Sequence, residues 1–392
     1  MKVLAVDIGS SSVKAAILTG PGVPRRQARV PFATRYEAGR AEVDFDAITA
    51  ATKAAIARLG TASRRVDLIV PTGMAPSWLA LDKGGHALTP VVTHQDRRSV
   101  DEALAIEGRI GRQRHLSICG NRPTPGGISS TTAAWFIRRA PGAMRRARLV
   151  GHLNTALLHA WCGVRVADPS NAGFSGLYRT RDFGGWSDEL CESAGVPLSL
   201  LPDVLDASAV AGRVTTGGAS AWGLREGTPV LAGLMDGSCA MLLAGGGALK
   251  AGQMVNVIGS TDVLAAAVDR FKPHPHLLTR PLGAGRIWLS VGTLAAAGTA
   301  VDWLQRTCFG EMTTPRFHAH LADVAAGATT QSLYGGVLQF DAQLAGRRTA
   351  IEPLWGSIRG LSLAATRDEL LLKLLANLAR ESARRLPLLA SR

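Results

Sequence analysis

Small and hydroxyl-bearing residues interrupt the first apolar stretch of the chain. Residues 7–14 read DIGSSSVK and lie between two runs rich in aliphatic residues, 2–8 and 13–18. Backbone N–H groups and hydroxyls in such a turn can approach a polyphosphate, and a carboxylate at a strand end can hold Mg²⁺ through water. The pattern therefore predicts either a phosphate-binding hairpin turn or a plain β-turn.

A second turn of the same kind, residues 259–261 (GST), follows another strand-like run in the other half of the chain. One such turn in each half could clasp a nucleotide's phosphate tail across a cleft. Between the two turns, Asp236 ends the apolar run 229–235. An acid at that place is either a general base that reaches into a cleft or a residue that forms a turn.

The elements that must position these residues indicate an α/β protein. Residues 2–18 predict a hairpin, and Asp44 is a candidate cap for a helix over 44–59. Strands and helices then alternate, as in layered α/β folds. Further strands are expected at 66–70, 90–93, 229–237, 252–259, 263–268 and 287–291, and helices at 131–139, 152–161 and 367–386.

The length of 392 residues favours two domains. The Gly/Ser/Thr-rich stretch 215–220 is the best linker candidate, and we divide the chain into residues 1–222 and 223–392. The strand at 229–237 is then expected to open the second, β-rich half. Leucines at 371, 374, 375 and 378 form an apolar helical stripe in that half.

Charge and cysteine usage limit the functional class. Lys and Arg number 44 against 30 Asp and Glu, a net +14 that favours anionic partners such as nucleotides, sugar phosphates, nucleic acid or acidic membrane. The basic cluster at 138–148 lacks interleaved aromatic residues, so nucleic acid is not expected. Five scattered cysteines, with neither a signal peptide nor a membrane span evident, predict a cytoplasmic protein without a disulfide framework.

The order of the motifs resembles that of the FGGY family of carbohydrate kinases, which includes xylulokinase and glycerol kinase. The likeness is collinear from residue 1 to about 385. Its parts are residues 7–14, like the family's first phosphate loop; 94–98 (HQDRR), like its Trp-x-Asp-x-Arg element; 168–172 (DPSNA), like its Thr-Asp-x-Ser-x-Ala stretch; 227–236, like the segment that supplies the catalytic base; and 259–261, like its second phosphate loop.

This resemblance implies two actin-like, ribonuclease-H-like domains with ATP, Mg²⁺ and a sugar or polyol in the cleft between them. Asp236 would take the proton from the acceptor hydroxyl, which then attacks the terminal phosphate. By the same likeness, the nucleotide site would comprise Asp7, Gly9, Ser10, Ser11, Lys14, Gly259, Ser260 and Thr261, with Asp7 orienting the metal; the substrate site would comprise Asp96, Arg98, Asp236 and Gly237.

The chain departs from the family pattern at three places. The positions of a polar pair that contacts substrate fall on Ala75 and Pro76, and His94 stands where the family has Trp. Neither Ala nor Pro can hydrogen-bond through its side chain to a sugar hydroxyl, so an atypical substrate is one expectation. The sequence ends at Arg392, just after the helix that precedes the family's adenosine-binding segment, so a shortened second domain with an exposed leucine stripe is another.

Together these features predict ATP-dependent phosphorylation of a small sugar or polyol by a carbohydrate kinase. The alternative is a non-catalytic or truncated family member that binds a sugar or a protein partner without efficient turnover. A homo-oligomer is left open. The particular hydroxyl compound is left open as well, because the side chains that would select it are those that depart from the pattern.

Overall fold

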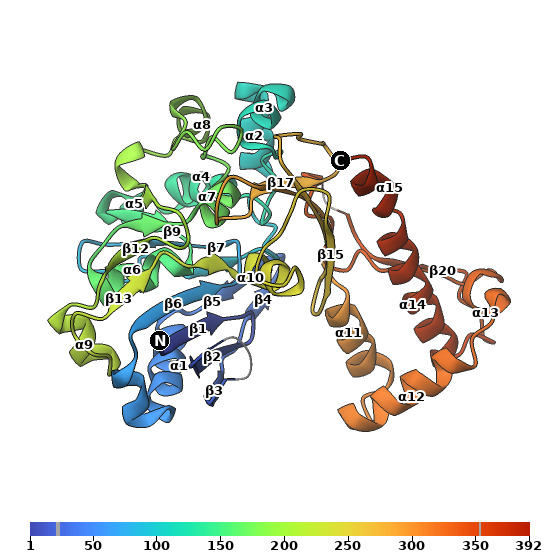
Figure 1. The fold of residues 1–392 in the computed structure, drawn as a ribbon. Helices are drawn as coiled ribbons and strands as arrows, with labels where there is room; N and C mark the ends of the chain where they lie inside the picture. The colour runs from blue at the N-terminus through green and yellow to red at the C-terminus, as the bar shows by residue number, and fades with distance from the viewer. Residues whose placement is uncertain (21–23, 353) are drawn as a thin grey trace.

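The first sheet contains the N-terminal hairpin together with strands from the middle of the sequence (Figure 1). The computed structural model describes residues 1–20, 24–352 and 354–392. Strand β1 pairs parallel to β6 and antiparallel to β2. The C-terminal ends of β1 and β6 therefore lie side by side. In order, the sheet contains β12 (Val210–Arg213), β13 (Pro229–Leu231), β6 (Leu68–Gly73), β1 (Val3–Ile8), β2 (Ser12–Leu18) and β3 (Arg26–Pro31), and β14 (Leu234–Met235) also pairs with β6.

Alternating apolar residues explain why this hairpin forms and what it covers. Leu4, Val6 and Ile8 on β1 are fully buried, as the two-residue period of a strand requires for a face against the core. Helix α1 (Phe45–Arg58) packs into the same core. The Asp44 carboxylate accepts a hydrogen bond from the backbone N–H of Asp46 at 2.9 Å and so begins the helix. The predicted hairpin and the predicted cap are both confirmed.

A second sheet and a group of helices complete the N-terminal half. The sheet runs β4 (Arg35–Glu37), β5 (Arg40–Val43), β8 (Val91–Thr93), β7 (Ser77–Leu81) and β9 (Leu149–Gly151). The helices are α2 (Val100–Ile110), α3 (Arg112–Cys119), α4 (Ser129–Arg139), α5 (Pro141–Arg146), α6 (Leu153–Cys162), α7 (Pro169–Ser175), α8 (Asp188–Ala194) and α9 (Thr216–Trp222), with the short elements η1 (Gly60–Arg65), β10 (Val166–Ala167), η2 (Leu198–Leu200) and β11 (Asp203–Val204).

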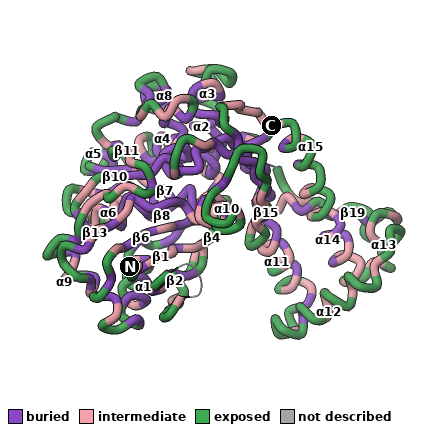
Figure 2. Tube along the Cα trace, in the orientation of Figure 1, coloured by how far each residue is buried: buried purple, intermediate pink, exposed green. Residues whose placement is uncertain are grey.

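The C-terminal half is built on an antiparallel sheet, which lies opposite the N-terminal hairpin in Figure 1. In Figure 2 the strands of this sheet nearest the middle of the molecule are mostly buried, whereas its edge strand, Met254–Ile258, and the outer helices carry many exposed residues. The sheet runs β15 (Met254–Ile258), β16 (Asp262–Val268), β18 (Trp288–Leu294) and β17 (Leu278–Pro281). Around it are α10 (Asp236–Ala244), α11 (Gly298–Cys308), α12 (Thr314–Ala326), α13 (Thr330–Tyr334), α14 (Arg367–Ala383), α15 (Leu386–Ala390) and the small pair β19 (Gln339–Asp341) and β20 (Ser357–Arg359).

The segment 215–220 is part of a helix, so the linker predicted there is wrong. Thr215 caps α9 by accepting a hydrogen bond from the backbone N–H of Gly218 at 3.0 Å. At the far end of the helix, the Trp222 ring lies edge-on to Trp161 with centroids 5.9 Å apart. The small polar composition suggested a linker, but the helix cap and the buried tryptophan anchor the segment to the core.

The strand expected to open the second half extends the first sheet instead. Val230 of β13 pairs with Ile69 of β6, and both side chains are fully buried. Strand β14 follows and pairs with the end of β6. The physical reason is that an apolar run this short gives no information on which sheet it joins, since that depends on a partner some 160 residues earlier in the chain.

The leucine stripe of α14 is covered within the chain, so the expectation that it is exposed is wrong. Leu371 and Leu374 are fully buried. They belong to a cluster with Phe309, Phe317 and Phe340, contributed by the segments around α11, α12 and β19. In the part of the chain that the structure describes, no helix is both long and apolar enough to cross a membrane.

Candidate active site

A cleft of about 440 Å³ brings together residues from both halves of the chain. Its lining includes every predicted nucleotide-site residue, together with Asp236 and the glycine that follows it. These residues are Asp7, Gly9, Ser10, Ser11, Lys14, Asp236, Gly237, Gly259, Ser260 and Thr261.

The first turn is a tight hairpin connection between β1 and β2. Its backbone closes through a hydrogen bond from the Gly9 N–H to the Ser12 carbonyl at 3.0 Å. Two outer contacts hold it: the Thr34 hydroxyl donates to the Ser10 carbonyl, and the Phe32 N–H donates to the Ser11 carbonyl, each at 3.0 Å. Because these contacts use carbonyls, the N–H groups and hydroxyls of the two serines are not consumed by them.

The second turn joins β15 to β16 and is held from behind by α11. The Gly259 N–H donates to the Thr261 carbonyl at 2.8 Å, and the Gly298 N–H at the start of α11 donates to the Gly259 carbonyl at 2.9 Å. A side chain at Gly298 would place its Cβ 2.6 Å from that carbonyl oxygen, so only glycine allows this approach. The two turns are thus equivalent hairpin connections, one in each half.

Asp236 occupies the junction of β14 and α10, and neighbouring side chains fix the strand that carries it. The Asn154 amide donates to the Leu234 carbonyl at 3.1 Å, and the Met235 N–H donates to the Ser170 hydroxyl at 3.2 Å. Ser170 belongs to α7, whose cap is Asp168. The segment 168–172 therefore holds the residue before Asp236 through Ser170, and none of its residues is among those described as lining the cleft.

The electrostatic surroundings make Asp236 a stronger base than an ordinary aspartate. Burial raises the pKa of Asp236 to about 6, and the nearby negative charge of Asp7 acts in the same direction. A hydrogen bond from the Gly237 N–H at 2.6 Å and the positive charges of Arg280 and Arg348 act in the opposite direction. At neutral pH the carboxylate is mainly ionised yet able to accept a proton.

Asp7 has the properties of a metal-orienting carboxylate. Its Oδ2 lies 3.4 Å from the exposed Lys14 ammonium, whereas its Oδ1 is buried without a hydrogen-bond partner among the described residues. A buried, unpaired carboxylate oxygen facing a cleft suits Mg²⁺, which takes one or two carboxylates together with water and phosphate oxygens. Within the described ranges, no group of three or more His, Cys, Asp or Glu side chains forms a protein-only metal site.

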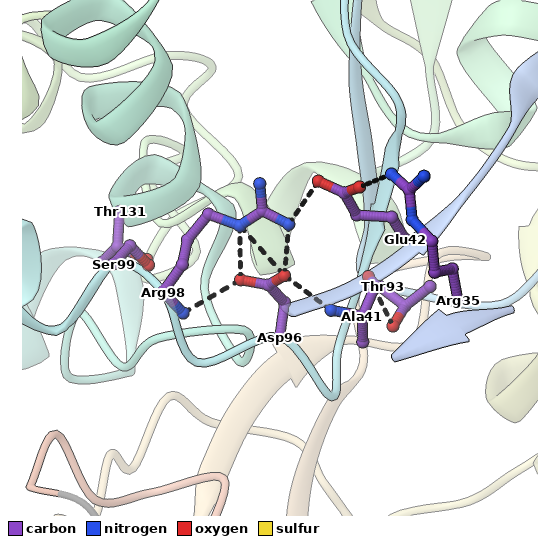
Figure 3. A network of polar contacts seen from close by, with 8 residues as sticks. All are labelled: Arg35, Ala41, Glu42, Thr93, Asp96, Arg98, Ser99 and Thr131. Atoms are coloured by element: carbon purple, nitrogen blue, oxygen red, sulfur yellow. Dashed lines mark hydrogen bonds and ion pairs between the residues drawn. The ribbon is translucent and has the colours of Figure 1, made fainter. Parts of the chain in front are cut away.

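Asp96 and Arg98 do not line the cleft in the described structure, although the sequence placed both in the substrate site. Figure 3 shows them in a separate buried network, where the Arg98 guanidinium lies between the carboxylates of Asp96 and Glu42, each at 2.6 Å. Asp96 also accepts a hydrogen bond from the Ala41 N–H at 2.8 Å. Because their charges are already paired, these side chains hold β5 to the segment after β8.

Two buried arginines, Arg280 and Arg348, line the cleft, and sequence reasoning missed both as site residues. Arg280 lies in the fully buried strand β17, and a charged residue two positions after the paired leucines Leu277 and Leu278 was a signal that could have been used. Arg348 lies in the loop between β19 and β20, and the residues beside it in the sequence form no motif that predicts a site. His94 also lines the cleft; burial and then the charge of Arg348 lower its pKa to about 3, so the ring is neutral.

The structure accounts for the departure at Ala75. Ala75 lines the cleft, and its carbonyl accepts a hydrogen bond from the Arg348 guanidinium at 3.3 Å. Ala75 has no polar side chain, but the guanidinium of Arg348, 273 residues further along the chain, lies beside it.

Comparisons with known proteins agree with this architecture. Residues 2–243 match the model of the N-terminal domain of the FGGY family of carbohydrate kinases. A glycerol kinase of Bradyrhizobium diazoefficiens is 28% identical over 320 residues, covering 77% of this chain and 62% of the relative. A xylulose kinase of Bacillus subtilis is 24% identical over 316 residues, covering 78% and 62%.

The crystal structure of xylulose kinase from Rhodospirillum rubrum superposes with a TM-score of 0.84 at 25% identity, covering all of this chain and 79% of that one. The fold is thus that of the actin-like, ribonuclease-H-like kinases, as predicted. The chain spans about 62% of the length of the curated relatives named above. Since the family model covers more than half of its residues, the chain belongs to the FGGY family of carbohydrate kinases.

Proposed function

We propose that this chain carries out ATP-dependent phosphorylation of a hydroxyl group on a small sugar-like or polyol-like compound, with Asp236 as the general base. The observation that carries the proposal is the meeting, in one cleft, of two hydroxyl-lined hairpin turns and a carboxylate with a pKa of about 6. Family membership and the glycerol and xylulose kinases among its relatives support the same reaction class.

The role of Asp236 follows from its pKa and place. An alcohol is a weak nucleophile until its proton moves to a base as the new bond to phosphorus forms. Asp236 stands at the N-terminus of α10, facing the cleft. Its carboxylate would accept the hydroxyl proton, and the charges of Arg280 and Arg348 keep most of it ionised at neutral pH.

The two turns would position the phosphoryl donor. Bound Mg-ATP would supply the phosphoryl group and neutralise charge on it as it transfers. Ser10 and Ser11 on one side and Ser260 and Thr261 on the other offer hydroxyls and backbone N–H groups for phosphate oxygens. Asp7 would orient the metal through its unpaired Oδ1.

Release of ADP from Mg-ATP tests the proposal. The assay uses a panel of ketoses, aldoses, polyols and their acids, with Asp236→Asn as the variant. We expect acceptor-dependent ADP release that falls by about 10³-fold or more in the variant, because the amide cannot accept the proton. Nucleotide binding should persist in the variant, since Asp236 is not part of either turn.

Loss of both turnover and nucleotide binding in folded protein would contradict the proposal. Folded protein that releases no ADP with any acceptor, and binds no Mg-ATP by calorimetry, is a non-catalytic family member. A Ser11→Ala, Thr261→Ala double variant provides the matched check on the nucleotide side. It should weaken Mg-ATP binding without changing the pKa of Asp236.

A further inference from the structure

Two arginine side chains are buried at the Asp236 end of the cleft. Arg280 is 1% exposed and Arg348 is 7% exposed. Arg280 comes from β17, and Arg348 from the loop after β19. Their guanidinium carbons lie 5.7 and 5.5 Å from the centroid of the Phe174 ring, so one aromatic ring contacts both cations.

Neutral partners, not carboxylates, accept the hydrogen bonds of these arginines. Arg280 donates to the Ser238 hydroxyl at 2.5 Å and to the Pro281 carbonyl at 3.2 Å, while Arg348 donates to the Ala75 carbonyl at 3.3 Å. The Nε of Arg348 is buried and has no partner in the described chain. Neither arginine forms an ion pair with any of the described residues.

Both arginines are charged, and neither is in contact with a carboxylate of the described residues. Burial lowers the pKa of each arginine to about 10, so both remain charged at neutral pH. Asp236 is the carboxylate that attracts both of them. Asp168 also attracts Arg280 at longer range, and its oxygens accept hydrogen bonds from the backbone and side chain of Ser170 and Asn171. Neither guanidinium therefore has a carboxylate in ion-pair contact within the part of the chain that the structure describes, and a buried charge is costly unless an opposite charge offsets it at close range.

The position of Arg280 separates it from the second turn. Strand β18 pairs with both β17 and β16, so it serves as a ruler between them. Arg280 of β17 is opposite Leu289 of β18, whereas Asp262, the residue after Thr261, is opposite Leu294. Five residues of strand separate these levels, roughly 17 Å along the sheet. The guanidinium Nη2 of Arg280 instead lies 3.7 Å from the point where Gly237 would carry a Cβ. It is thus beside Asp236, where an acceptor must present its hydroxyl.

Apolar groups form much of the wall around the arginines. Met74, Ala75, Phe174 and Leu278 line the cleft there. Such a wall offers few side-chain hydrogen-bonding groups to a neutral, many-hydroxyl sugar. It lowers the local dielectric and so strengthens the attraction between a guanidinium and an anion.

We propose that the acceptor of this kinase is a hydroxy acid of the aldonate type, whose carboxylate is bound by Arg280 and Arg348 while one hydroxyl faces Asp236. A carboxylate bound there would give both guanidinium groups the ion-pair contact that the described residues do not supply. A guanidinium also matches the planar carboxylate in shape and in its paired donors. This inference rests on the function proposed above and names its substrate class.

Calorimetric binding without nucleotide tests the inference on the intact protein. The probes are matched acid and alcohol pairs: D-gluconate with D-glucitol, D-xylonate with xylitol, and D-glycerate with glycerol. We expect at least one acid to bind about tenfold or more tightly than its alcohol. Arg280→Met and Arg348→Met should each reduce that preference toward equality, and Arg280→Lys should retain part of it.

The control variant is Arg286→Gln, because Arg286 is exposed on the same hairpin and contacts Phe183 and the Asp182 carbonyl outside the cleft. It should leave the acid preference unchanged. Alcohols that bind as well as their acids, or acid binding that persists in both methionine variants, overturn the inference. Tighter binding of D-xylulose 5-phosphate than of any acid overturns it as well.

The comparison of acid and alcohol binding to the unaltered protein tests the inference even where a variant fails to fold. Because binding is measured without ATP, failure of this inference is distinct from failure of the proposed function. ADP release with neutral polyols alone would support the kinase function and contradict the proposed acid acceptor. Acid binding without ADP release in the presence of any acceptor would support the acid-binding site and contradict the kinase function.

Discussion

Two clusters of aspartate and arginine in this chain use the same residue types in opposite ways. In the network of Figure 3, Arg98 is chelated by Asp96 and Glu42 at 2.6 Å, and all three side chains are nearly inaccessible to solvent. In the cleft, Arg280 and Arg348 attract Asp236 without forming an ion pair in the described chain. The charges of the first cluster are paired with one another, whereas the arginines of the second have no ion-pair partner among the described residues.

Pairing governs what each cluster can do. Burial alone would lower the pKa of Arg98, but hydrogen bonds and charge from Asp96 and Glu42 raise it overall, so its ionised form is satisfied within the protein. In the cleft, burial instead raises the pKa of Asp236 to about 6 and lowers the pKa of each arginine to about 10. A buried charge that neighbours have neutralised stabilises geometry, whereas one that they have not can bind or react.

The largest expected effect distinguishes the clusters by stability. Asp96→Ala should lower the free energy of unfolding by about 3 kcal/mol, because Arg98 loses a buried partner and the Ala41 N–H loses its acceptor. Urea denaturation at pH 7 measures this change.

Asp236→Asn is the matched comparison for that experiment. It should leave unfolding within about 1 kcal/mol of the unaltered protein, and on the stabilising side, because an ionised carboxylate with a raised pKa opposes folding at neutral pH. Equal destabilisation by the two substitutions would show that the clusters do not differ as we describe.

The next effect concerns pH. A base must be deprotonated, so kcat/KM for the proposed reaction should fall as the pH drops through about 6, the pKa of Asp236. Arg348→Met removes a positive charge that lowers this pKa, so the midpoint should move upward, by about one pH unit. The pH profiles of both proteins measure the shift.

A midpoint that stays in place, or moves downward, would mean that Arg348 does not act on Asp236. Carboxyl resonances followed by NMR titration, with Asp236→Asn to assign the signal, give the same answer independently of turnover.

The smallest effect is expected where a pair is exposed. Lys14 is 60% exposed and lies 3.4 Å from Asp7. Solvent screens such a pair, so Lys14→Ala should change the free energy of unfolding by less than about 0.5 kcal/mol. Thermal unfolding at two salt concentrations measures it; a loss comparable to that of Asp96→Ala would place Lys14 in a closed network.

Much of the site was accessible from local sequence. The two turns and the cap at Asp44 are closed by hydrogen bonds between residues close together in the chain, and Asp236 was marked by an acid at the end of an apolar run. Other predictions failed where distant partners decided the outcome. The 215–220 segment became a helix because Trp222 packs on Trp161, and the α14 leucines are covered by aromatic residues of other elements.

The sequence by itself determined the hairpin turns and the acid that faces them, because turn chemistry is set by small residues within a few positions of each other. Only the tertiary structure decided which charges are paired. Arg98 and Asp96 are two residues apart and complete their network with Glu42, whereas Arg348 reaches the Ala75 carbonyl across 273 residues. Coulombic energy depends on distance in space and on burial, and the fold sets both.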